Sequence, residues 1–216
     1  MDEFISAAEF HRRPGVGDWR VTGLGATLVL TATSFEHAAT IVAAVVDAGN
    51  RFGVQADVDL RPEAAVVRVP DLPDGIPAAA PAFAATVSEA AARLRLIPDP
   101  ARAQSVGIYV AQHSHADVRP FFAAALGYEP FGEGDAMDPL RIGPRLAFNP
   151  IVPDVPGRGR THFDVFVPAD QALDRVQAAT AAGGRLVDDS NAPIFWSLAS
   201  PDNHGVDIAG WTDGVD

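Results

Sequence analysis

The sequence predicts an α+β protein built from two domains. Three observations indicate this: strand-like runs alternate with helix-forming stretches, a proline-rich segment interrupts them near residue 100, and the part after it repeats one order of elements. The chain has 216 residues, of which 48% are hydrophobic and 20% charged, so it holds enough apolar side chain for folded cores. We place the domains at residues 1–97 and 106–216, joined by a linker over residues 98–105.

The first domain is predicted to be a sheet packed by helices. Residues 18–32 contain a run that favours strands, and Ser34 can cap the apolar-periodic helix expected over residues 35–48. Alternation over residues 58–69, interrupted by a proline, predicts a bend or hairpin. Residues 82–96 are rich in alanine and predict a second helix.

The second domain repeats the order β-α-β-β-β. Neither copy could bury its sheet alone, and two such halves usually pair to make a curved sheet around a cleft. The first copy has a strand at 106–112, a helix at 117–126 and three short strands up to residue 151. The second copy has a strand at 161–167, a helix at 170–182 and strands at 185–187, 194–198 and 205–209.

Charge and composition exclude several classes of function. The formal net charge is −12, and all 16 basic residues are arginine, so we expect neither nucleic-acid nor membrane partners. The absence of lysine rules out a lysine Schiff base, and the absence of cysteine rules out disulfides and thiolate metal sites. The first residues lack a signal-peptide pattern, and no apolar run is long enough for a membrane span, so we predict a cytoplasmic protein.

Four segments of the second domain carry a family resemblance. They are RPFFAAALGY at 119–128, RTHFDVFVP at 160–168, AAGGRLVDD at 181–189 and APIFWSLASPDNHGVDIAGW at 192–211. In this order they resemble the vicinal-oxygen-chelate superfamily, also called glyoxalase-like or bleomycin-resistance-like proteins. The resemblance implies the paired β-α-β-β-β fold and a small-molecule substrate or ligand.

The first domain is similar to the pterin-4a-carbinolamine dehydratases. The similarity lies in FHRRPGVGDWRV, SFEHAATIVAAVVDAGNRFG and ADVDLRPEAAVVRV. The family removes water from a 4a-hydroxy-pterin with histidines of an H-H-P segment, but residues 54–56 here read Val-Gln-Ala. We therefore interpret this domain as a scaffold that has lost the chemistry. Asp57, Asp59 and Arg61 either rebuild it or, as we prefer, solvate a strand end and form a salt bridge.

Metal-dependent members of the glyoxalase-like superfamily place His or Glu on the first and last strands of each half, so that four side chains converge on one divalent ion. His162 stands at the first-strand position of the second half, but Gly205 occupies the place of the expected Glu. Aligning the halves puts Val106 opposite His162. One ligand of four cannot hold the ion, so we predict no metal and no cofactor.

Strand alternation predicts an acid/base pair instead. His162, Asp164 and Phe166 share one face of their strand, and Asp207 shares the face that Gly205 presents. A carboxylate close to His162 would orient the imidazole and stabilise its protonated form. The alternative is structural, with the backbone satisfying His162 and solvent satisfying Asp207 at a sheet edge.

Large side chains near these strands predict the walls of a site. Phe166, Trp196 and Trp211 are candidates for binding an apolar ligand, since an indole N–H can also meet a ligand oxygen. Arg158 and Arg160 precede the strand of His162 and either clamp an anionic group or belong to a solvated loop.

Three functions follow as hypotheses. The first is a metal-independent lyase or isomerase that performs dehydration, isomerisation or cyclisation on a small apolar oxygenated metabolite, as in secondary-metabolite tailoring. In it, His162 is the acid/base group and Asp207 or Asp164 is its partner. The second is a binding protein that sequesters a small molecule, and the third is a 4a-hydroxytetrahydrobiopterin dehydratase. Both families commonly self-associate, so the resemblances also imply a homodimer.

Overall fold

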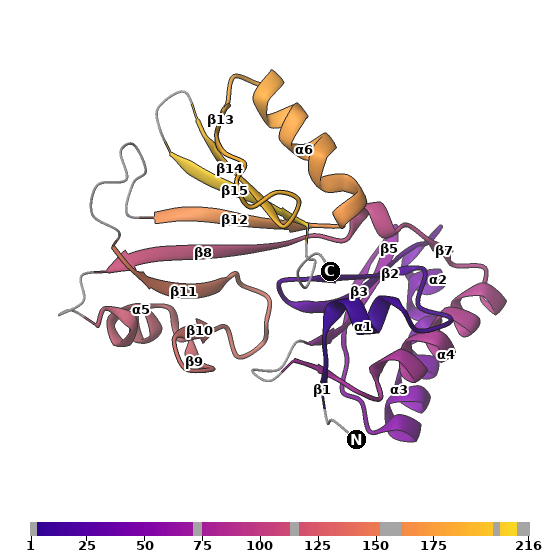
Figure 1. Ribbon diagram of the computed structural model, residues 1–216. Coiled ribbons are helices and arrows are strands. Elements are labelled where there is room, and N and C mark those ends of the chain that lie inside the picture. Colours follow the sequence, from indigo (N-terminus) through magenta and orange to yellow (C-terminus); the bar gives the residue numbers. More distant parts are fainter. Residues whose placement is uncertain (1–3, 71–74, 113–116, 152–160, 201–203, 211–216) are drawn as a thin grey trace. The chain divides into compact units, whose positions relative to one another are not determined.

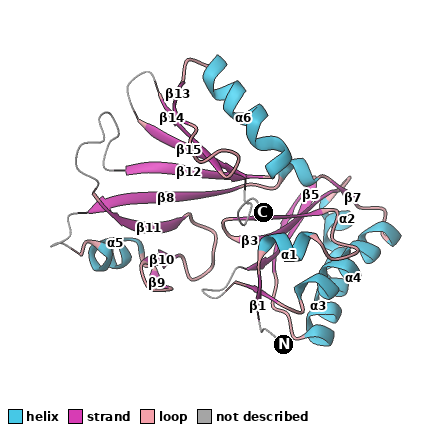
Figure 2. Cartoon of the chain, in the orientation of Figure 1, coloured by secondary structure: helices cyan, strands magenta, loops and turns pink. Residues whose placement is uncertain are grey.

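The computed structural model describes residues 4–70, 75–112, 117–151, 161–200 and 204–210 (Figure 1). The chain divides into two compact units that meet in sequence between Ala103 and Gln104. Both units combine helices with sheet, which confirms the predicted mixed class (Figure 2). In the part of the chain described, no helix has the length and apolar character needed to cross a membrane.

The first unit is an antiparallel sheet with helices, as the sequence predicts. Its core centres on Trp19, which is fully buried against Phe83 and donates its indole N–H to Ser88 Oγ at 3.0 Å. The sheet runs β2-β3-β5-β4, with β7 on β3, and a separate ribbon pairs β1 with β6. The strands are β1 (Phe4–Ile5), β2 (Trp19–Thr22), β3 (Gly25–Thr31), β4 (Asp57–Arg61), β5 (Ala64–Pro70), β6 (Ile76–Pro77) and β7 (Ile97–Pro98). The helices are α1 (Ala7–His11), α2 (Phe35–Ala39), α3 (Ile41–Phe52) and α4 (Ala80–Arg93).

The segment expected to be a linker carries regular structure. Its first residues form β7, which pairs with β3, and the Asp99 N–H donates to the Val29 carbonyl at 2.9 Å. A 3₁₀ turn follows at Pro100–Arg102, and the next strand already begins at Ser105. The prolines at this place therefore end one sheet rather than form a free connection.

The second unit is built on one eight-stranded sheet in the order β13-β14-β15-β12-β8-β11-β10-β9. The β-α-β-β-β order occurs twice, as predicted, and the two halves join where β8 pairs antiparallel with β12. The first half contains β8 (Ser105–Gln112), α5 (Arg119–Leu126), β9 (Glu129–Phe131), β10 (Asp135–Met137) and β11 (Arg145–Pro150). The second half contains β12 (Thr161–Val167), α6 (Ala169–Ala181), β13 (Arg185–Asp188), β14 (Phe195–Ala199) and β15 (Gly205–Gly210).

Apolar side chains from both halves bury one face of this sheet. Val167 and Ile208 pack with α6, and Val110 and Phe148 pack with Phe122 of α5. The residues of β8 that pack with α5 lie on the same face as the residues of β12 that contact α6. Both α5 and α6 therefore lie on the same side of the sheet. The opposite face of β8, β12 and β15 points away from α5 and α6, and we call it the open face.

Candidate functional site

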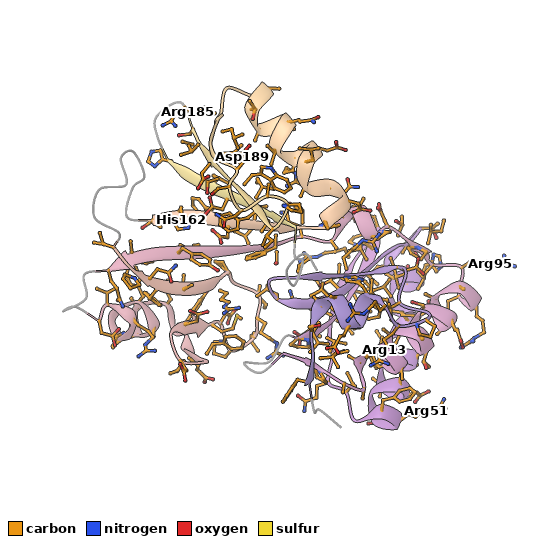
Figure 3. All side chains as sticks on the ribbon, viewed as in Figure 1. Arg13, Arg51, Arg95, His162, Arg185 and Asp189 are labelled. Carbon is orange, nitrogen blue, oxygen red and sulfur yellow. The ribbon has the colours of Figure 1, made fainter. Side chains whose placement is uncertain are left out.

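The open face carries the polar groups of the second half. Alternation along β12 places His162, Asp164 and Phe166 on it. Figure 3 shows His162 on this strand. The parallel pairing of β12 with β15 sets Asp207 directly beside Asp164. The sequence predicted this shared face correctly, because alternation follows from strand geometry alone.

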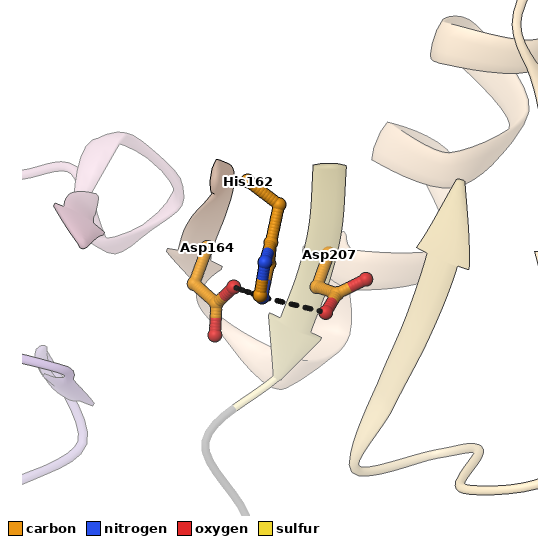
Figure 4. Close-up of side chains that lie close together, drawn as sticks. All are labelled: His162, Asp164 and Asp207. Carbon is orange, nitrogen blue, oxygen red and sulfur yellow. Dashed lines mark ion pairs between the residues drawn. The ribbon is translucent and has the colours of Figure 1, made fainter. Parts of the chain in front are cut away.

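His162 lies between two carboxylates. Its Nε2 is 3.3 Å from Asp164 Oδ1 and 3.5 Å from Asp207 Oδ2 (Figure 4). The three side chains are only 21%, 14% and 10% exposed, so water screens their charges less than at the protein surface. The distances are those of ion pairs rather than of short hydrogen bonds. The structure therefore brings together the three groups that the sequence analysis selected for acid/base chemistry.

The two carboxylates beside the imidazole of His162 also lie next to each other. Asp164 and Asp207 are direct neighbours across two strands, and like charges in that position destabilise a sheet. A positive charge close to both carboxylates offsets this repulsion. The imidazole of His162 lies close to both carboxylates from the same face.

Tyr109 completes the cluster, and the sequence analysis missed it. It is the partner of His162 in the β8–β12 pairing, and the two ring centroids are 5.2 Å apart with an interplanar angle of 31°. The sequence alignment of the halves had placed Val106 opposite His162, but Val106 pairs with Val165 on the helix-covered face. Alternation along β8 indicates which residues share a face with Tyr109, but only the pairing register identifies its neighbour.

Burial, followed by the negative charge of Asp164, raises the pKa of Tyr109 to about 12. Asp135 and Asp207 act in the same direction, and the guanidinium of Arg145 opposes them. The phenol therefore stays protonated throughout the physiological range and can donate a hydrogen bond.

Gly107 forms the floor between Tyr109 and Phe166. A Cβ added at Gly107 would lie 3.4 Å from Tyr109 Cε2 and 3.6 Å from Phe166 Cε2, so both rings lie over this glycine. Arg145 is the neighbour of Gly107 on the other side, and its Nε donates to Asp135 Oδ2 at 2.6 Å. Its charge is thus largely balanced by Asp135, and the rings give the cluster an apolar side.

Of the predicted wall residues that the structure describes, Phe166 joins the cluster and Trp196 does not. Trp196 pairs with Ile208 and packs against the α6 core, because alternation along β14 turns it to the helix-covered face. Phe166 does lie on the open face and is 9% exposed. Trp211, Arg158 and Arg160 fall outside the described residues.

The donor set differs from the ion cage that the resemblance implies. Gly205, which offers no ligand atom, stands beside His162 on the last strand, and Tyr109 lies across from it in the first half. One atom each from His162, Asp164 and Asp207 lies within 4.8 Å of the others, close enough to share a cation, but all three come from the second half. The residues present therefore do not fit the four-ligand cage built from both halves.

In the described part of the first unit, the positions at which the predicted resemblance implies histidines hold Val54, Gln55 and Ala56. Residues 54–56 precede β4, and Arg61 Nη2 lies 2.8 Å from Asp59 Oδ2 as an exposed ion pair. This is the salt bridge that we preferred for these residues. The described part of this unit also has a groove of about 630 Å³ lined mainly by alanine and proline, with Glu9 and Arg13 at its polar end.

Comparison with known protein families finds a match within the second unit. No curated protein matches the chain. A crystal structure of a glyoxalase/bleomycin resistance protein/dioxygenase superfamily member from Vibrio splendidus 12B01 is similar, with 18% identity, coverage of 49% of this chain and 97% of that one, and a TM-score of 0.34. The family model of the glyoxalase-like domain matches residues 107–209. Residues 107–209 are therefore similar to the glyoxalase-like domain, and the similarity of residues 1–97 to dehydratases remains a prediction.

Proposed function

We propose that the second unit is an acid/base enzyme for a small oxygenated molecule, with His162 as the proton-transfer group. The observation that supports this most is the position of Nε2 between two little-exposed carboxylates, at 3.3 Å and 3.5 Å. Imidazole is the side chain best suited to exchange protons near neutral pH, and positioned carboxylates stabilise the imidazolium form. Asp164 and Asp207 are its partners.

The proposed steps need only the residues of the chain. Neutral His162 takes a proton from the substrate, and the electron pair of the broken bond stays on the substrate. The imidazolium then lies between Asp164 and Asp207, which stabilise it by Coulomb attraction. Returning the proton to another substrate atom completes an isomerisation, and giving it to a departing hydroxyl completes a dehydration with water as the product.

Hydrogen exchange tests this proposal without knowledge of the natural substrate. Protein in D₂O is incubated with 1-tetralone, and loss of the proton signal beside the carbonyl is followed by NMR. We expect exchange above the buffer rate for the wild type, and loss of that excess in His162→Gln. His204→Gln is the matched control, because His204 is an exposed histidine just before β15. Equal exchange in wild type and His162→Gln would contradict the assigned role.

Metal content tests the metal-independent form of the proposal. We expect dialysis against a chelator to leave exchange unchanged. A divalent ion bound in a one-to-one ratio, removed together with activity and absent from Asp207→Asn, would instead show that the three donor atoms hold a cation.

A second candidate function is sequestration of a small molecule. The observation that favours it is the apolar side of the cluster, where the Tyr109 and Phe166 rings lie over Gly107. Tight binding of a compound that is recovered unchanged after long incubation with the wild type would support binding over catalysis. We expect no turnover of a 4a-hydroxy-pterin in a direct assay, because residues 54–56 lack histidine.

A further inference from the structure

We propose that Tyr109 binds a substrate oxygen by donating its phenolic hydrogen bond beside His162, so that the site selects carbonyl or hydroxyl compounds with an apolar body. The inference rests on the proposed function, since it assigns the substrate class and an additional binding residue to the same site. Three observations support it: the position of the ring, the state of the hydroxyl and the pairing of the neighbouring charges.

The ring of Tyr109 is fixed beside the proton-transfer group. The β8–β12 pairing sets Tyr109 beside His162 on the open face. The centroids of the two rings are 5.2 Å apart. Both strands are central in the eight-stranded sheet, so each is hydrogen-bonded to a neighbour on both sides. A substrate that reaches His162 therefore meets Tyr109 at a defined place.

Within the described residues, no protein group binds the hydroxyl of Tyr109, which leaves it for a ligand. The hydroxyl makes no hydrogen bond to the described residues, and its oxygen is not fully buried by that part of the chain. The phenol is protonated at neutral pH, because burial and the Asp164 charge hold its pKa far above the physiological range. It can therefore donate to an oxygen acceptor but cannot act as the base.

The groups around Tyr109 indicate what kind of ligand the site can bind. Arg145 and Asp135 are bound to each other, which leaves the guanidinium partly neutralised. Asp164 and Asp207 lie beside His162 Nε2. Phe166 offers an apolar surface next to Tyr109 over Gly107. A molecule with one oxygen on an apolar skeleton satisfies this arrangement, whereas an anion would meet two carboxylates.

Matched probes test the assignment. Binding of 1-tetralone and of tetralin, the hydrocarbon without the oxygen, is measured for wild type, Tyr109→Phe and Tyr128→Phe. Tyr128 is the only other tyrosine and serves as the control. We expect about a tenfold weaker affinity for the ketone in Tyr109→Phe, no change in Tyr128→Phe, and equal affinity for tetralin in all three, since one hydrogen bond is lost. The carbonyl stretching band of bound 1-tetralone should shift to lower frequency in the wild type and not in Tyr109→Phe.

Equal ketone affinity in wild type and Tyr109→Phe, or no saturable ketone binding to the wild type, would overturn the inference. The two proposals fail separately. His162→Gln should keep ketone affinity and lose hydrogen exchange, so exchange that survives in His162→Gln removes the proposed function while leaving the Tyr109 contact in place. Exchange lost in His162→Gln together with unchanged ketone affinity in Tyr109→Phe removes the Tyr109 contact alone.

Discussion

The titration of Tyr109 gives the most direct measurement of the electrostatics of the cluster. The chain has two tyrosines, so Tyr128→Phe leaves Tyr109 as the only phenol. Its pKa is raised from 10.0 to about 12, with burial as the first cause and the charge of Asp164 as the second. At pH 11 about a tenth of Tyr109 should therefore be ionised, against about nine tenths of an ordinary tyrosine.

The assay is the tyrosinate absorbance of Tyr128→Phe as the pH rises, with circular dichroism at each pH to confirm that the protein stays folded. Adding Asp164→Asn should lower the midpoint, but keep it above 10.0, because burial is the larger cause. A midpoint near 10 in the folded Tyr128→Phe protein would refute the reasoning, since it would mean that Tyr109 is neither buried nor close to the carboxylates.

The same shift has a consequence for stability. The folded protein holds the Tyr109 proton more tightly than the unfolded chain does, so the unfolded chain loses it first as the pH rises. The contribution is complete below pH 10 and is lost as the pH rises through about 12. Tyr109→Phe should therefore show a smaller loss of thermal stability than the wild type between these two values.

Three further changes test the packing of the second unit and a helix cap of the first. Leu198→Ala, in the α6 core, should lower the free energy of unfolding by about 2–5 kcal/mol in a urea titration, and an unchanged midpoint would contradict the burial of this side chain. Ser34→Ala removes the cap that accepts the His37 N–H at 3.1 Å and should cost about 1 kcal/mol in the same experiment. Gly210→Ala should lower the melting temperature, because the new Cβ would lie 2.9 Å from Ala169 Cα; a melting temperature equal to that of the wild type would show that β15 and α6 are further apart.

The sequence predicted the elements of the second unit well, because their signals are local. Alternation over residues 161–167 matches β12, and the glycine after residue 126 ends α5 in the left-handed conformation that favours glycine. In the first unit the helix expected over residues 35–48 is divided at Thr40 into α2 and α3, and the Thr40 hydroxyl donates to the His37 carbonyl at 2.6 Å. Such a local hydrogen bond competes with a continuous helix and leaves no periodic signal.

The site was predictable only in part, for a reason that lies in the pairing of strands. Alternation predicts that His162, Asp164 and Asp207 share one face. It applies within each strand, and the two strands belong to the same half. Tyr109 comes from the other half, and its place depends on a register that no local pattern fixes. Trp196 was misplaced because an aromatic side chain suits a core as well as a ligand.

The β8–β12 junction has a further consequence for how this protein can change over time. The two halves share one architecture, but His162, Asp164 and Asp207 belong to the second, while the first contributes Tyr109 and the Arg145–Asp135 ion pair. Under the proposed function, the second half would carry the proton transfer and the first half would contribute to substrate binding. New specificities could then arise by substitutions in β8 and β11 without disturbing the reactive strand pair.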